Sequence, residues 1–190
     1  QWQKAHPRGR VVGTREELLV VDTSSTDPIL GLFESDHMAF EADRDRAGEP
    51  SLTEMTAKAL EMLSGNDQGY LLMVEAGRID HAHHYDNAYR ALTSTVELAD
   101  AVQEAMDRTD PEETLIVVTS DHGHTMTISG YPTRGNPILG LVVGNDASGD
   151  PAAAPTLAWD GMPYTTLAYA NGPSVPRRGG RADLSGVDTT

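Results

Sequence analysis

The sequence predicts an α/β fold in which helices cover both faces of a mostly parallel sheet, a three-layer α/β/α sandwich. Two observations predict it. Segments with helical periodicity alternate with apolar segments of strand length, the order of a βαβ unit. Those apolar segments do not alternate polar and apolar side chains, as expected for parallel strands buried on both faces. At 190 residues, the chain is long enough for one domain with a core, or for a large part of a bigger one.

The first clear helix is predicted to begin at a capping box. In residues 51–54 (SLTE), Ser51 takes the N-cap position and Glu54 follows three residues later. The helix is expected to end near Gly65. Apolar side chains recur between these points at helical spacing, at Leu52, Met55, Ala59 and Met62.

A second alternation of strand and helix follows. Residues 70–74 (YLLMV) and 115–119 (LIVVT) are continuous apolar runs of buried-strand length. Between them we expect a helix that ends before Pro111. Its apolar face is formed by Leu92, Val96, Ala99, Val102 and Met106.

The amino-acid composition changes after these elements. Residues 138–143 predict a further strand, and residues 164–169 predict a short one within a region rich in Gly, Pro, Ala and Asp. We expect residues 1–144 to form part of the α/β core and residues 145–190 to form a loop-rich, crown-like segment. The end at Thr190 carries no stop signal, so we expect an incomplete fold.

Composition excludes several kinds of partner and site. Fourteen Lys and Arg against twenty-nine Asp and Glu give a formal charge of −15, which argues against nucleic acid or an anionic membrane as the main partner. No apolar run approaches the ~20 residues that cross a bilayer. Cysteine is absent, so any metal ion must be held by His, Asp and Glu.

Two polar clusters directly follow the two best predicted strands. They are residues 75–84 (EAGRIDHAHH) and 120–124 (SDHGH). Ligands of open parallel sheets bind beyond the carboxyl ends of the strands, so both clusters are expected at one crevice. Asp80 and His84 would share a helix face if a helix begins there. Imidazole and carboxylate ligands favour Zn²⁺, whereas Glu75 alone suits Mg²⁺.

Each cluster also has a simpler interpretation. An Asp-His pair after a strand is often a turn or a helix N-cap. The three His of residues 81–84 could be a solvated helix start, and Glu75 could be a surface carboxylate. Both clusters carry metal-ligating residue types, and both directly follow a predicted strand. This coincidence favours metal binding.

Longer segments of the chain resemble the alkaline phosphatase family. Residues 74–84 closely resemble its first metal-binding segment. Residues 119–124 resemble its second metal-binding segment, and residues 130–137 are similar to the stretch that follows the second segment. Shorter matches in order and spacing lie at residues 31–38, 49–52 and 169–173. The resemblance implies hydrolysis of phosphate monoesters with two Zn²⁺ and one Mg²⁺, and a periplasmic or extracellular location.

The resemblance also implies roles for individual residues. Asp80 and His84 would bind the zinc that activates the attacking water. Asp121 and His122 would bind the zinc that stabilises the serine alkoxide. Glu75 would bind magnesium. Two zinc ions could then clamp the attacking and leaving oxygens of an in-line displacement.

Two further assignments follow from the same resemblance. His81 occupies a position that contacts phosphate, directly or through water. The backbone carbonyl of Phe33, with Glu34 and Glu49, resembles most of a calcium site found in some members.

The resemblance covers only the later half of the family pattern. The nucleophilic Ser lies upstream in the family and is not in this chain, and the last zinc histidine would fall beyond Thr190. Ser120 stands beside Asp121, but it belongs to the strand before the metal ligand and is a poor substitute nucleophile. An incomplete parallel sheet would expose an apolar edge, so we expect a homodimer or a complementing chain.

Three functional hypotheses remain open from the sequence. The chain is part of an alkaline phosphatase that hydrolyses phosphate monoesters, or it is a metal-binding fragment without chemistry of its own. A weaker alternative is a related phosphodiesterase or sulfatase, against which the match over residues 75–84 argues.

Overall fold

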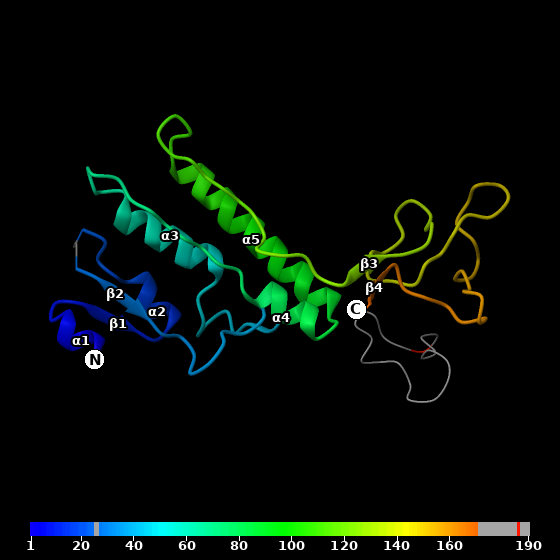
Figure 1. Ribbon diagram of the computed structural model, residues 1–190, viewed down its shortest axis with the longest axis horizontal. Helices are drawn as coiled ribbons and strands as arrows, with labels where there is room; N and C mark the ends of the chain where they lie inside the picture. The colour runs from blue at the N-terminus through cyan, green and yellow to red at the C-terminus, as the bar shows by residue number, and fades with distance from the viewer. Residues whose placement is uncertain (25–26, 171–185, 187–190) are drawn as a thin grey trace. The chain divides into compact units, whose positions relative to one another are not determined.

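The computed structural model describes residues 1–24, 27–170 and 186 (Figure 1). The chain divides into two compact units. The first consists of Gln1–His81 and Arg90–Ser120, and the second of Ala82–Tyr89 and the described residues from Asp121 onward. Helix α4 (Arg78–His84) is continuous across this division. None of the helices in the described part combines the length and the apolar character that crossing a bilayer requires.

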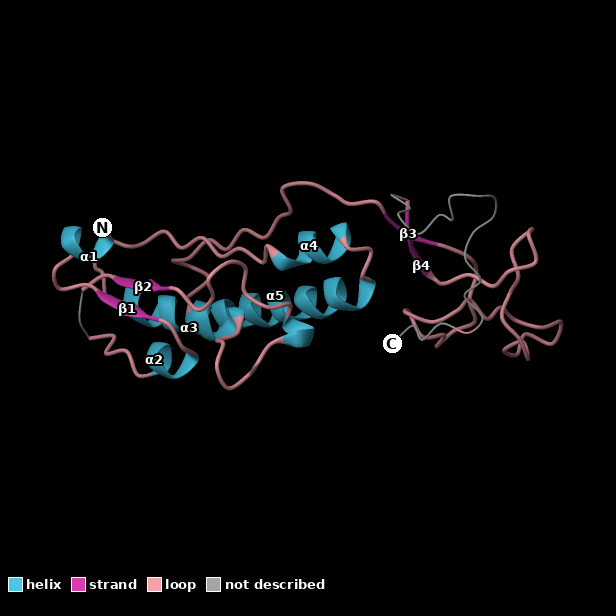
Figure 2. Cartoon of the chain, turned by 90° about the horizontal axis from the view of Figure 1, so that it is seen from below, coloured by secondary structure: helices cyan, strands magenta, loops and turns pink. Residues whose placement is uncertain are grey.

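The first unit holds a small parallel sheet and most of the helices (Figures 1 and 2). Strand β1 (Arg10–Val12) pairs in parallel with β2 (Ile29–Gly31), with Arg10 opposite Ile29 and Val12 opposite Gly31. The core beside this sheet is formed by Val12, Leu18 and Val21, at 0% to 8% exposed, with Ile29, Phe33 and Met55 packed against them. The elements are α1 (Trp2–Ala5), β1 (Arg10–Val12), α2 (Arg15–Leu19), β2 (Ile29–Gly31), a 3₁₀ turn (Glu41–Asp43), α3 (Leu52–Leu63) and α5 (Ala88–Arg108).

Helix α3 begins at the predicted capping box. The Ser51 hydroxyl accepts a hydrogen bond from the Glu54 amide at 3.1 Å, and the Ser51 amide donates to the Glu54 carboxylate at 3.0 Å. Arg15 of α2 also donates to that carboxylate, from Nε at 2.9 Å and from Nη2. Glu54 therefore ties the start of α3 to α2 as well as capping the helix.

The predicted long helix is α5, and it lies beside α3 in Figures 1 and 2. The Thr53 amide, at the start of α3, donates to the Glu97 carboxylate of α5 at 2.8 Å. Because the first-turn amides of a helix have no partner within it, this bond adds to the capping of α3 and also joins the two helices.

The two best predicted strands are not strands in the structure. Residues 70–74 and 115–119 have extended or irregular backbone without a paired neighbour among the described residues. Their apolar side chains are exposed, with Leu71 at 93%, Met73 at 84% and Leu115 at 87%. A strand is held by hydrogen bonds to its neighbouring strands. Segments that favour strand formation but lack such a neighbour therefore do not form strands. The described fold is therefore fragmentary α/β with small sheets, and the continuous parallel sheet of a three-layer sandwich is not formed.

The second unit contains an antiparallel pair, β3 (Met126–Ile128) and β4 (Leu167–Tyr169). The strand predicted at residues 164–169 is thus present at its C-terminal end. Residues 138–143 form no strand, and only an isolated bridge joins Leu141 to Thr165. This segment is nevertheless packed, since Val142 is 1% exposed.

The described residues after Asn145 consist mostly of loops. Apart from β4 they contain turns, bends and isolated bridges, such as that between Asn145 and Pro151. The division of the chain at residues 144 and 145 into core and crown-like segment stays a prediction. Most of residues 171–190, including the predicted match at 171–173, lies outside the described residues.

The contact between Arg15 and Glu54 predicts a pH-dependent contribution to stability. The hydrogen bond from Arg15 is the main cause that lowers the pKa of Glu54 below its ordinary value of 4.5. A lowered folded-state pKa stabilises the fold above the unfolded pKa, and this contribution is lost as the pH falls through the folded pKa. Glu54→Gln keeps an oxygen for the capping box but removes the charge. We expect it to lower the free energy of unfolding at neutral pH by less than about 1 kcal/mol.

Urea unfolding followed by circular dichroism at about pH 7 and pH 3.5 measures this effect. The difference between Glu54→Gln and the parent chain should be largest at about pH 7 and should shrink as the pH falls through the lowered pKa of Glu54. Glu54→Ala serves as the matched control, because it also removes the capping oxygen and should still cost about 1 kcal/mol at the lower pH, where the effect of the Gln variant has shrunk. A Gln variant that is equally destabilised at both pH values would contradict the prediction.

Candidate metal centre

Helix α4 carries two candidate ligands on one face. Its first turn is closed by the Ile79 amide, which donates to the Ala76 carbonyl at 3.1 Å. Side chains four residues apart on a helix project from the same face. Asp80 and His84 have this spacing, and their ligand atoms lie within 4.8 Å of each other. The helix that the sequence predicted for these two residues is therefore present.

A second segment brings a third candidate ligand to His84. His124 precedes β3, and its ligand atom lies within 4.8 Å of that of His84. The two imidazole rings are perpendicular, with centroids 4.8 Å apart. In the part of the chain that the structure describes, Asp80, His84 and His124 are the group that could surround one metal ion. We call it the metal group.

The donor set of the metal group fits a borderline divalent ion. It offers one carboxylate oxygen and two imidazole nitrogens, with no sulfur. Catalytic zinc sites commonly combine three such protein ligands with one open position. The same donors suit calcium or magnesium poorly, because those ions prefer oxygen ligands.

His83 and Tyr169 lie next to the metal group. The Nδ1 atom of His83 and the phenol oxygen of Tyr169 are 2.8 Å apart. The His83 ring stacks on the His124 ring, with centroids 5.0 Å apart and an interplanar angle of 26°. Burial, and to a smaller degree the charge of Asp86, raises the pKa of the Tyr169 phenol. Tyr169 therefore stays neutral at mildly alkaline pH.

The predicted ligands Asp121 and His122 are not members of the metal group, although the His122 ring lies beside the His124 ring, with centroids 6.3 Å apart. Their side chains are 88% and 58% exposed. The His122 amide donates to its neighbour Asp121 at 3.0 Å, and the His122 ring nitrogen Nδ1 donates to the Gly123 carbonyl at 2.9 Å. The structure thus brings His124, and not this pair, to His84. The assignment of Asp121 and His122 to a second zinc stays a prediction.

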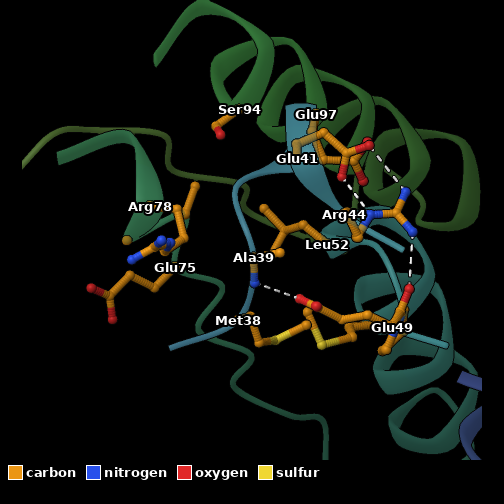
Figure 3. A pocket seen from close by; sticks show the side chains of 14 residues that line it. Met38, Ala39, Glu41, Arg44, Glu49, Leu52, Glu75, Arg78, Ser94 and Glu97 are labelled. Atoms are coloured by element: carbon orange, nitrogen blue, oxygen red, sulfur yellow. Dashed lines mark hydrogen bonds and ion pairs between the residues drawn. The ribbon is translucent and has the colours of Figure 1, made fainter. Parts of the chain in front are cut away.

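Glu75, the predicted magnesium ligand, lies on exposed backbone ahead of α4. It lines a pocket of the first unit, but its carboxylate points away from those of Glu41, Glu49 and Glu97 (Figure 3). The structure therefore does not gather Glu75 with other acidic side chains, and its magnesium role stays a prediction.

Glu49 is the most distinctive of the three predicted calcium ligands. It is 6% exposed, and its carboxylate accepts a hydrogen bond from the Ala39 amide at 2.9 Å (Figure 3). Burial is the main cause that raises its pKa, and the charge of Glu34 adds to it. Phe33 packs against the core of the first unit. A cation would relieve the cost of this buried charge, but the calcium site stays a prediction.

The side chain of His81, predicted to contact phosphate, is held by two neighbours. Arg78 Nη1 lies 2.8 Å from His81 Nδ1, and the His37 ring meets the His81 ring edge-on at 4.4 Å. Because a guanidinium has only donors, Nδ1 must accept this hydrogen bond. The proton of the neutral imidazole is then on Nε2, which can donate to an anion.

Sequence reasoning did not assign roles to His124, His83 or Tyr169. His124 belongs to the segment 120–124 that the sequence marks as polar, and its two-residue spacing from His122 was the available signal. The contact of His83 with Tyr169 joins residues 86 positions apart, and no local pattern predicts such a pair.

Comparisons with known proteins agree on one family. The family model described as Alkaline phosphatase matches residues 1–188. The chain is 44% identical over 191 residues to the tissue-nonspecific alkaline phosphatase isozyme of Gallus gallus, covering 98% of this chain and 35% of that protein. It is 38% identical over 191 residues to the membrane-bound alkaline phosphatase of Bombyx mori, covering 97% and 32%. The chain thus spans about a third of the length of the curated relatives it matches.

A solved structure is also similar. It is the crystal structure of Thermus thermophilus alkaline phosphatase, at 40% sequence identity and a TM-score of 0.48. The match covers 54% of this chain and 21% of that one.

The geometry of the metal group predicts which histidines control zinc affinity. We expect His124→Ala to weaken binding of the tightest zinc ion by at least about tenfold, because it removes one of three ligands. His122→Ala is the matched control from the same segment and should change that affinity much less. Competition with a chromophoric chelator measures both. Equal losses in the two variants, or a larger loss in His122→Ala, would show that a different set of ligands binds the ion.

Proposed function

This chain belongs to the alkaline phosphatase family, and we propose that it serves the metal-dependent hydrolysis of phosphate monoesters through two zinc ions and one magnesium ion. The observation that carries the proposal is the metal group, in which a carboxylate and two imidazoles lie within reach of one ion. The family membership supplies the reaction class, and the donor set supports zinc.

The residues of the metal group would each do part of this work. Asp80 and His84 would hold one zinc ion, and His124 would supply its third ligand within this chain. A zinc ion in such a site supplies Lewis acidity and lowers the pKa of bound water to about 7. The positive charge of the metals also offsets the formal charge of −15 on the chain, which would otherwise repel a phosphate dianion.

His81 would contribute to binding of the phosphate group. Its Nδ1 accepts from Arg78, so its Nε2–H is available as a donor to a phosphate oxygen. We further propose Asp121 and His122 as ligands of the second zinc and Glu75 as a ligand of magnesium. For the calcium site, the buried charge of Glu49 is the supporting observation.

Partners and location are proposals of the same kind. The exposed apolar segments 70–74 and 115–119 support association with a second copy or a complementing chain, because unpaired strand-forming segments readily pair with others. A periplasmic or extracellular location fits the family. A metal-binding role without catalysis, or activity on phosphodiesters or sulfate esters, remains as the alternative to be tested.

Hydrolysis of p-nitrophenyl phosphate by the zinc- and magnesium-loaded chain, alone and together with a complementing chain that carries the nucleophilic Ser, tests the proposal. We expect activity to be lost on chelation, restored by zinc, and reduced at least about hundredfold by Asp80→Asn, which keeps the size of the side chain but removes its charge. Asp67→Asn, in an exposed turn, is the matched control and should leave activity unchanged.

The outcomes separate the alternatives. Zinc binding without hydrolysis of any ester would favour a metal-binding chain that lacks chemistry of its own. Hydrolysis of bis(p-nitrophenyl) phosphate or p-nitrophenyl sulfate in preference to the monoester would favour the related hydrolases. Activity that survives Asp80→Asn would exclude the metal group as the reactive site.

A further inference from the structure

Arg78 is the first residue of α4 and lies three positions before His81, on the same face of the helix. We propose that Arg78, supported by the ring of Phe40, is a positioning residue that fixes the tautomer and the direction of the His81 imidazole for binding of a phosphate oxygen. The proposal deepens the proposed function and rests on it for the identity of the bound anion.

The first step is the hydrogen bond between these two side chains. Arg78 Nη1 and His81 Nδ1 are 2.8 Å apart, a normal hydrogen-bond length. A guanidinium can only donate, so His81 Nδ1 accepts and the proton of the neutral ring lies on Nε2. In the other tautomer two N–H groups would face each other, and Nε2 would present a lone pair to the phosphate. Arg78 therefore determines whether His81 attracts or repels an anion at Nε2.

The second step is the support of Arg78 itself. Its guanidinium carbon lies 3.8 Å from the centroid of the Phe40 ring, within the range of a cation–π contact. Its Nε atom is buried and has no hydrogen-bond partner among the described residues. The guanidinium is thus placed mainly by the aromatic ring and by His81. Because a flat group that lies against a ring keeps its plane, the direction in which Nη1 donates follows from the position of Phe40.

The ring of Phe40 is in turn held in place. Phe40 is 7% exposed, and its carbonyl accepts a hydrogen bond from the Asp43 amide at 2.9 Å. A second guanidinium carbon, that of Arg90 on α5, lies 4.8 Å from the centroid of the same ring. Arg90 Nε also pairs with the Asp43 carboxylate at 2.7 Å. Phe40 therefore offers Arg78 a surface that cannot turn freely.

The third step is a contact on the ring of His81. The His37 ring meets it edge-on, with centroids 4.4 Å apart and an interplanar angle of 63°. Rotation of the His81 ring would break the hydrogen bond at Nδ1 and would also bring the ring against His37. The two contacts together limit the side-chain torsions of His81. Its Nε2–H group is thus held in one direction before any anion binds.

Such support has a measurable value. Partners that orient a histidine at a metal site are typically worth about 10–100-fold in affinity or activity. Without Arg78 the His81 ring can still adopt the Nε2–H tautomer, only less often and in less defined directions. We therefore expect a smaller effect, of about three- to tenfold, on phosphate binding.

Arg78→Met tests the proposal, because methionine keeps an unbranched apolar stem against Phe40 but has no N–H donor. Two-bond ¹H–¹⁵N correlation spectra of the metal-free chain labelled with ¹⁵N-histidine, at about pH 9, show which ring nitrogen carries the proton. We expect the Nε2–H tautomer of His81 in the parent and a mixture of both tautomers in Arg78→Met. The ring signals of His6, which lies against Trp2, should stay unchanged.

The affinity for inorganic phosphate is the second measurement, made on the zinc- and magnesium-loaded chain in the presence of the complementing chain. It should fall by about three- to tenfold in Arg78→Met. Arg46→Met is the matched control, since it removes the same charge from a side chain that is 79% exposed, and it should leave the affinity unchanged. Far-ultraviolet circular dichroism should be the same for the parent and both variants.

The two measurements separate this proposal from the proposed function. If the parent binds no phosphate, the proposed role of His81 fails, while the tautomer measurement still decides the positioning role of Arg78. A proton on His81 Nδ1 in the parent would overturn the proposal. Identical His81 ring signals in the parent and Arg78→Met would also overturn it, as would unchanged phosphate affinity of Arg78→Met when the parent binds phosphate.

Phe40→Leu tests whether Phe40 acts through Arg78, because leucine keeps an apolar side chain but removes the ring. We expect a smaller share of the second His81 tautomer than in Arg78→Met. The double variant should match Arg78→Met, because Phe40 has no route to His81 without the guanidinium. Additive effects would show that Phe40 acts separately and would overturn its part in the proposal. If circular dichroism shows that Phe40→Leu does not fold, Arg78→Met decides the proposal by itself.

Discussion

The contact of Arg78 with Phe40 is the constraint on which the arrangement of candidate site residues in the first unit depends. The guanidinium carbon of Arg78 lies 3.8 Å from the centroid of the Phe40 ring, and Phe40 is 7% exposed. Partly desolvated contacts of this kind contribute roughly 0.5 to 2 kcal/mol. Because Arg78 is the first residue of α4, the contact anchors the turn that carries Asp80 and His81. The same guanidinium reaches His81 Nδ1, so one side chain anchors the helix and sets the tautomer of a neighbouring residue.

The parts of the fold that the sequence predicted well are those whose determinants are local. The capping box of Ser51 and Glu54 is formed by residues three apart, and α4 follows from the spacing of its own side chains. The strands at residues 70–74 and 115–119 were predicted from equally clear apolar runs, yet they are not strands. A helix satisfies its backbone internally, whereas a strand depends on neighbours. Helical periodicity in the sequence therefore identifies a helix by itself. An apolar run shows only that a segment can form a strand.

The same distinction explains what was predicted of the site. Asp80 and His84 share one helix, so their spacing alone placed them together. His124 reaches His84 through the backbone path into β3, and Tyr169 reaches His83 through the pairing of β3 with β4. These two paired strands are about forty residues apart in the sequence, and a short sequence window carries no signal of such pairing. The sequence marked the polar segment 120–124 correctly but could not show that its last histidine is the one that meets α4.

These contrasts bear on how metal binding relates to catalysis in this chain. The metal group is built from a helix and the segment before a short antiparallel pair, and none of its residues lies on the unpaired segments 70–74 and 115–119. Formation of a large parallel sheet is therefore not a precondition for bringing these three ligands together. Hydrolysis requires more than ligands, because nucleophile, metals and phosphate contacts must share one geometry. Metal affinity and hydrolytic activity are thus separable properties of this sequence.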